Sequence, residues 1–145
     1  MRTGHQDTAR ELAAEALKRA RETGMGYMGP SMLALGALLA EDEAVRASLV
    51  AEAEASLAGG ALAHNHILVG YAFIELGHVR VDPDYMEEQA SKLEAVCADE
   101  PLPYVKFLLR RARVLAAALR GRPSHAMAVE AQALLEWRNA PAVLA

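Results

Sequence analysis

The sequence is short of the residues that build β-sheets. Its 145 residues include 2 isoleucines, 3 threonines and 10 valines, and 5% of them are aromatic. Because strands favour β-branched and aromatic side chains, this scarcity argues against a sheet of any size. Alanine and leucine are abundant instead, with 31 and 20 copies, and both are strong helix formers. The composition therefore predicts an all-α protein.

Three further absences narrow the class of protein. Cys97 is the one cysteine, which excludes an internal disulfide and a cysteine-based zinc cluster. No apolar run approaches the roughly 20 residues that cross a bilayer, and the polar N-terminus lacks the apolar core of a signal peptide. The net charge of −4 gives no overall attraction to nucleic acid or to an anionic membrane. We therefore expect a single domain over residues 1–145, located in the cytoplasm, with neither a membrane nor a nucleic acid as partner.

Short interruptions, most of them containing glycine or proline, separate the apolar stretches at regular intervals. The segments between them predict about seven helices, at approximately 6–22, 30–40, 43–58, 62–78, 83–98, 102–120 and 124–138. The predicted starts at 43, 83 and 123 are 40 residues apart. Such a period is typical of repeated helical hairpins that each bury an apolar face against a neighbour. We expect antiparallel helix hairpins stacked in a short right-handed solenoid.

Several predicted helix ends carry residues suited to that position. Asp82 precedes Pro83, so the aspartate can cap a helix whose first turn takes the proline. Thr8 and Glu11 have the spacing of a capping box. Gly77 and Gly121 stand where helices are expected to stop.

Short segments at turns and helix starts resemble one known family. The segments are Thr23-Gly24-Met25-Gly26-Tyr27-Met28-Gly29-Pro30, Ala63-His64-Asn65-His66, and Glu100-Pro101-Leu102-Pro103 followed by Arg111 and Arg113. They resemble the C-terminal tetratricopeptide-like region of bacterial adenylate/guanylate cyclase signalling proteins, over roughly residues 12–122. The resemblance implies a helical scaffold for protein binding or regulation in bacterial signalling. The chain departs from the family pattern at Tyr71-Ala72, where a charged pair is expected.

Gly24-x-Gly26-x-x-Gly29 has the spelling of a dinucleotide-binding fingerprint. That chemistry needs a parallel strand before the glycines, so that the pyrophosphate meets the N-terminus of the following helix. Here a predicted helix precedes them and Pro30 begins the next one, which indicates a loop between two helices. We therefore expect no nucleotide and no other cofactor.

Four polar residues of the helix at 62–78 share one face at 100° per residue: His64, Tyr71, Glu75 and His78. Glu75 and His78 have the i,i+3 spacing of metal ligands in helical bundles. His64 lies about 16 Å from Glu75 along the axis and is too distant to share that ion. Two interpretations stay open. The residues line a groove that binds a partner, or Glu75 and His78 serve a small metal-dependent hydrolase.

The charge of the chain is divided unevenly. Residues 41–100 hold 13 acidic and 3 basic side chains, whereas residues 101–122 hold six basic and no acidic ones: Lys106, Arg110, Arg111, Arg113, Arg120 and Arg122. Lys106, Arg110, Arg113 and Arg120 fall on one stripe of the predicted helix, beside its apolar arc. The stripe is either a site for an acidic partner or a phosphate, or a solvated face partly neutralised by Glu87, Glu88 and Glu94.

These observations predict a non-catalytic helical-repeat scaffold that binds a protein or peptide partner. The candidate binding residues are His64, Tyr71, Glu75, His78, Lys106, Arg110 and Arg113. No catalytic residue and no cofactor is expected. The apolar stretch at 140–145 and the opposite charges of the helices at 83–98 and 102–120 also suggest a homodimer.

Overall fold

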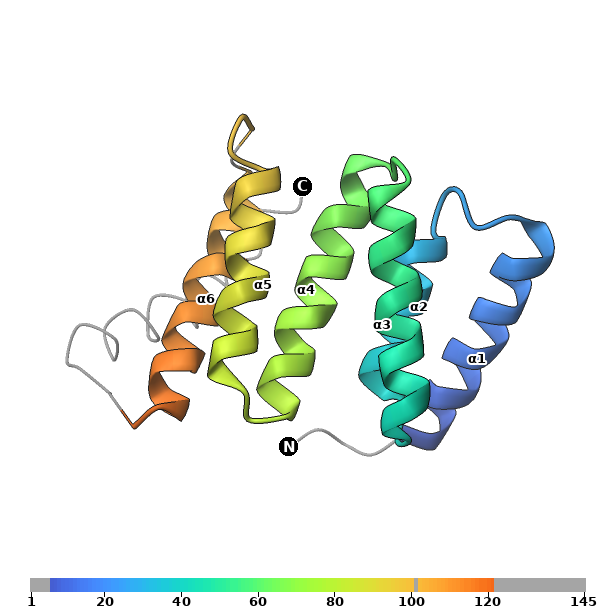
Figure 1. The fold of residues 1–145 in the computed structure, drawn as a ribbon, viewed down its shortest axis with the longest axis horizontal. Helices are drawn as coiled ribbons and strands as arrows, with labels where there is room; N and C mark the ends of the chain where they lie inside the picture. Colours follow the sequence, from blue (N-terminus) through green and yellow to red (C-terminus); the bar gives the residue numbers. More distant parts are fainter. Residues whose placement is uncertain (1–5, 101, 122–145) are drawn as a thin grey trace, which may run out of the picture. The chain divides into compact units, whose positions relative to one another are not determined.

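The computed structural model describes residues 6–100 and 102–121, which form six α-helices and no strand (Figure 1). The helices are α1 (Gln6–Thr23), α2 (Gly29–Leu39), α3 (Glu43–Ala58), α4 (Ala63–Val79), α5 (Pro83–Val96) and α6 (Pro103–Leu119). For this part of the chain the all-α prediction is confirmed, and every predicted boundary agrees within two residues. The seventh predicted helix, at 124–138, lies outside the described residues. Thr8 lies inside α1, so the predicted capping box is wrong.

Two compact units divide the chain, Met1–Leu76 and Gly77–Ala145. The boundary falls within α4, so α1, α2, α3 and most of α4 belong to the first unit. The end of α4, α5 and α6 belong to the second. Each unit has buried apolar residues of its own. The expectation of a single domain over 1–145 stays a prediction.

α2 is the centre of the first unit, because both α1 and α3 pack against it. Ala34 and Ala37 of α2 are fully buried. At Gly36 a Cβ would lie 3.3 Å from Leu49 Cδ1 of α3 and 3.9 Å from Leu17 Cδ2 of α1. Small residues on α2 therefore let its two neighbours approach closely.

Arginines from both neighbours satisfy the C-terminal end of α2. The last four carbonyls of a helix have no partner within it, and that end carries a partial negative charge. Arg10 of α1 donates from Nε to the Leu39 carbonyl oxygen at 3.2 Å. Arg46 of α3 donates from Nε to the Ala37 carbonyl oxygen at 3.3 Å and from Nη2 to that of Ala40. The Arg46 side chain is only 15% exposed, so these charge-assisted bonds form largely out of water.

The start of α2 is held from α4. Met28 occupies the N-cap position and makes no capping hydrogen bond with its side chain. The carbonyl of Tyr27 accepts from Asn65 Nδ2 at 2.8 Å and from His64 Nε2 at 3.0 Å. Asn65 is fully buried, and its Oδ1 accepts from the Ser31 hydroxyl at 2.6 Å. A buried amide thus joins the α1–α2 loop, the first turn of α2 and the first turn of α4.

The glycine-rich segment is a loop between two helices, as predicted. α1 ends at Thr23 and α2 begins at Gly29, so no strand precedes the glycines. Gly24 has a φ of 111°, a conformation that side chains other than glycine rarely adopt. A Cβ at Gly29 would lie 2.7 Å from Met25 Cβ. These glycines allow the chain to reverse direction tightly between α1 and α2.

In the second unit α5 packs against α6, and Val105 and Ala112 of α6 are buried. The prediction that Gly77 ends a helix is wrong, because α4 continues to Val79. A Cβ at Gly77 would lie 2.6 Å from Met86 Cγ and 3.1 Å from the Met86 backbone nitrogen. Glycine is needed there because α5 approaches the end of α4 closely.

α4 is terminated by Val81 instead, whose φ of 56° is left-handed. The Asp82 N–H donates to the Gly77 carbonyl oxygen at 2.9 Å, which is the longer bond of a Schellman motif. The Asp82 side chain then accepts from the Tyr85 N–H at 3.0 Å, so the predicted cap of α5 is confirmed. Gly121, with a φ of 66°, follows α6 at the position expected for a glycine that ends a helix. Val81 is strained, because a β-branched residue is unfavourable in the left-handed conformation that glycine adopts readily.

Replacing Arg46 by methionine is expected to lower the free energy of unfolding by about 2 kcal/mol, because part-buried carbonyls of α2 lose a charged donor. The matched control is Arg19→Met. Arg19 is 73% exposed and pairs with Glu15 of its own helix, so its loss is expected to cost less than about 0.5 kcal/mol. Urea unfolding followed by circular dichroism measures both variants. Equal losses would show that Arg46 does not hold the end of α2.

The variant Val81→Gly is expected to raise the free energy of unfolding by about 1 kcal/mol, because glycine adopts the left-handed conformation without strain. Val79→Gly is the control. Val79 is also an exposed valine two residues earlier, but it is helical, so glycine there is expected to destabilise by roughly 0.5–1 kcal/mol. Thermal and urea unfolding give both values. A loss of stability in Val81→Gly would contradict the strain at this turn.

Candidate functional site

The predicted polar face of α4 is partly covered. His64, Tyr71 and His78 are half-buried, Leu68 is 37% exposed, and Glu75 is only 2% exposed. His64 already has a structural role. Besides its bond to the Tyr27 carbonyl, its ring lies 5.0 Å from the ring of Tyr27, measured between centroids, at an interplanar angle of 51°.

The alternative of a metal site would use Glu75 and His78, three residues apart in the last turns of α4. A metal centre needs at least one further ligand from the protein. Within residues 6–100 and 102–121, no group of three or more His, Cys, Asp or Glu side chains could hold a metal ion. The Nδ1 atom of His78 is buried and makes no hydrogen bond, but no third ligand joins Glu75 and His78 among the described residues, so the metal-dependent hydrolase stays a hypothesis.

α6 carries the second predicted group of residues on its outer side. Lys106, Arg110 and Arg113 are all exposed, and we call these three residues the basic face. Another side of α6 packs against the core through buried apolar residues: Val105, Leu108, Leu109, Ala112 and Ala116. At 100° per residue the centres of the two sets lie about 110° apart around the helix.

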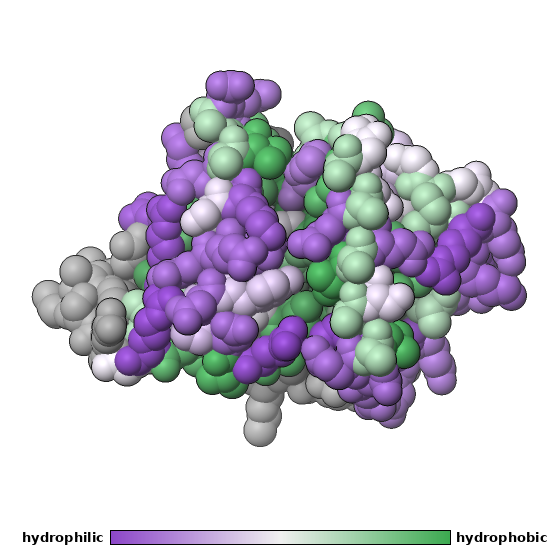
Figure 2. All heavy atoms as spheres, viewed as in Figure 1, coloured by the Kyte–Doolittle hydropathy of each residue, from purple (hydrophilic) through white to green (hydrophobic). Residues whose placement is uncertain are grey.

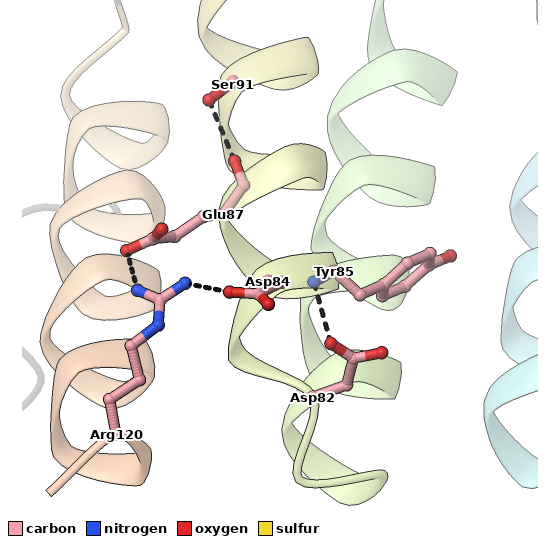
Figure 3. A network of polar contacts seen from close by, with 6 residues as sticks. All are labelled: Asp82, Asp84, Tyr85, Glu87, Ser91 and Arg120. Carbon is pink, nitrogen blue, oxygen red and sulfur yellow. Dashed lines mark hydrogen bonds and ion pairs between the residues drawn. The ribbon is translucent and has the colours of Figure 1, made fainter.

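Ion pairs across the α5–α6 hairpin use part of the positive charge (Figure 3). Arg120 follows the last residue of α6 and bonds two carboxylates of α5, Glu87 Oε1 at 2.6 Å and Asp84 Oδ1. Arg113 of α6 also forms an ion pair with one carboxylate of α5, that of Glu94. The hydrogen bond from Arg120 lowers the pKa of the Glu87 carboxyl below its ordinary value. The pKa of Arg120 is raised in turn, chiefly by its hydrogen bonds to Glu87 and Asp84.

The beginning of α6 differs from those of α3 and α5. Asp42 and Asp82 cap α3 and α5 with their side chains. At α6 the N-cap residue is Leu102, which makes no capping hydrogen bond with its side chain, and the first turn has no acidic residue. Lys106, the fourth residue of α6, instead adds positive charge near the positive end of the helix dipole.

An apolar row runs beside the basic face and was missed by the sequence analysis. Phe107 and Val114 are half-buried and Ala118 is exposed; these three residues are the apolar row, and Phe107 takes part in a further interaction within the chain. At 100° per residue they fall within an arc of about 40°, adjacent to the arc of about 60° that holds the basic face. Their spacing of seven and then four residues along α6 is the signal that would have identified them.

α3 presents another exposed surface, made of small side chains. Figure 2 shows a column of weakly hydrophobic spheres along this helix, where exposed alanines follow one another: Ala44, Ala47, Ala51, Ala55 and Ala58. The visible surface over α5 is hydrophilic by comparison. Alanine methyl groups carry no charge or donor with which to select a ligand, so the α6 surface is the stronger candidate site.

A comparison with protein-family models finds no match, and neither a curated protein nor a solved structure gives a significant match. Among the described helices, none is long and apolar enough to cross a lipid bilayer.

The lowered pKa of Glu87 predicts how stability depends on pH. A carboxyl group with a folded-state pKa below its unfolded value contributes stability above the unfolded pKa, and this contribution is lost as the pH falls through the folded value. Glu87→Gln is therefore expected to destabilise the protein at pH 7, by no more than about 1 kcal/mol because the pair is partly exposed. As the pH falls well below 4.5, the wild type is expected to lose that advantage.

Urea unfolding at pH 7 and at pH 3 measures this difference. The control is Glu88→Gln, because Glu88 pairs with Lys92 inside α5 and does not join the two helices. A deficit of Glu87→Gln that stayed constant over the whole pH range would contradict an ion pair as its cause.

Proposed function

We propose that the chain is a non-catalytic, tetratricopeptide-like helical scaffold that binds a protein or peptide partner. The observation that carries this proposal is the pairing of consecutive helices through short connections: α1 with α2, α2 with α3, and α5 with α6. α3 and α5 also begin 40 residues apart, at Glu43 and Pro83. A repeat of this kind buries one face of each helix and leaves the other available for binding.

The chemistry of individual residues supports a scaffold over an enzyme. His64 and Arg120 are engaged in bonds that hold the fold. Burial raises the pKa of the Cys97 thiol, which reduces the fraction of the nucleophilic thiolate at neutral pH. The glycine-rich loop follows a helix and so lacks the strand on which dinucleotide binding depends.

The resemblance to the helical region of bacterial cyclase signalling proteins gives this scaffold its setting. In the proposal it works in the bacterial cytoplasm as a regulatory interaction module and requires no cofactor. A homodimer is a further proposal. Of its two grounds, the charge complementarity between copies is weaker than the sequence suggests. The opposite charges of α5 and α6 meet inside one chain, in the pairs of Arg113 with Glu94 and of Arg120 with Glu87. The segment at 140–145 lies outside the described residues.

Site-specific photocrosslinking in cells that make the protein tests the scaffold. A photoreactive amino acid at outward positions, Ser48 of α3 and Ala118 of α6, is expected to give a crosslink to a defined protein from at least one position. The buried position Ala112 is the control and is expected to give none. The identified protein must then bind the purified chain in calorimetry. No protein partner at either outward position, together with turnover of a substrate by the purified chain, would contradict the proposal.

A further inference from the structure

The outer side of α6 combines two kinds of surface in parallel. The basic face (Lys106, Arg110 and Arg113) and the apolar row (Phe107, Val114 and Ala118) occupy adjacent arcs of one helix. From residue 106 to residue 118 they extend about 18 Å at 1.5 Å per residue, or just over three helical turns. A partner helix of about 12 residues would match this length.

We propose that this side of α6 binds an acidic amphipathic helix of a partner protein, with carboxylates against the basic face and apolar side chains against the apolar row. The inference rests on the proposed function, because it names the chemistry of the partner that the scaffold binds. An amphipathic helix presents its apolar residues in one stripe and its charges beside it, which is the arrangement that the surface of α6 complements.

Charge selects an acidic partner. α6 contains four basic residues and no acidic residue within Pro103–Leu119. Glu94 neutralises part of the charge of Arg113, so Lys106 and Arg110 carry most of the selectivity. Arg110 also takes part in an interaction within the chain. A guanidinium group has five N–H donors, which leaves donors for a second carboxylate.

The start of α6 adds to this selectivity. α3 and α5 have acidic residues at their caps and in their first turns, whereas α6 has neither, and its fourth residue is Lys106. A carboxylate from a partner would meet both the cations and the positive end of the helix dipole.

A nucleic acid fits this surface less well than a peptide. Single strands bind through stacking of successive bases on aromatic rings, and α6 offers two such rings, of which Phe107 is only half-exposed. The net charge of −4 over the whole chain also opposes a polyanion, whereas a short peptide meets the local positive charge.

The test uses the full chain and a fluorescein-labelled synthetic peptide of 18 residues that forms a helix with glutamates on one side and leucines on the other. Fluorescence anisotropy is expected to show saturable binding that weakens as the salt concentration rises from 50 to 300 mM. Two control peptides are expected to bind at least tenfold more weakly. One has the same composition in an order that removes the amphipathic pattern, and the other has lysine in place of glutamate.

Variants of the chain locate the site. The double variant Lys106→Glu/Arg110→Glu is expected to weaken binding at least tenfold, and the milder Lys106→Gln/Arg110→Gln is expected to weaken it about threefold to tenfold. Lys18→Glu/Arg19→Glu is the matched control. It makes the same change of charge on exposed positions of α1 and is expected to change the affinity less than twofold. Circular dichroism checks that each variant is folded.

Several results would overturn the proposal: no binding of the acidic peptide, equal binding by the α6 variants, equal binding of either control peptide, or tighter binding of an RNA of equal charge. Self-association abolished by the α6 variants would identify a second copy as the occupant and would overturn it as well. The proposed scaffold function has a separate outcome. A protein partner that crosslinks at Ser48 of α3 but not at Ala118 would leave the scaffold in place and remove the α6 site alone.

Discussion

The hydrogen bonds that close the two ends of α2 are the constraint on which the first unit depends. α2 has 11 residues and neither a side-chain cap nor a basic residue in its last turn, so it is too short to be stable alone. Buried backbone groups without partners cost free energy. Arg10 and Arg46 supply donors at its end, and Asn65 holds the loop and the first turn at its start. Three neighbouring helices are thereby fixed around α2.

This arrangement decides which polar residues are available for binding. A histidine beside an exposed tyrosine and an arginine between two carboxylates are features that a search for function singles out. In the structure His64 fastens the α1–α2 loop and Arg120 closes the α5–α6 hairpin. We therefore propose the basic face of α6, whose three residues are exposed, as the surface that binds a partner. Polar groups are thus used inside each unit, while residues on one side of α3 and of α6 stay exposed.

The sequence was sufficient for the elements and insufficient for the contacts between them. Boundaries were predictable because Asp82-Pro83 and Gly121 act locally, through capping and backbone conformation. Gly77 was misread because its role is a close approach to Met86 in the next helix, which no local pattern reveals. The buried amide of Asn65 was missed for the same reason: its partners Ser31 and Tyr27 are 34 and 38 residues away. In the candidate site the basic residues were found from their charge and helical spacing, whereas the apolar row was missed although its spacing was visible in the sequence.

NMR chemical-shift mapping tests the central proposal, which is that each unit keeps its fold while a partner binds the exposed face of α6. Backbone amides of the isotope-labelled chain are followed while the acidic amphipathic peptide is added. The account predicts that the large shifts are confined to α6 between Lys106 and Ala118, and that the amides of α2 and of Asn65 stay unchanged. Large shifts within α2, or shifts that spread over both units without a maximum on α6, would contradict it.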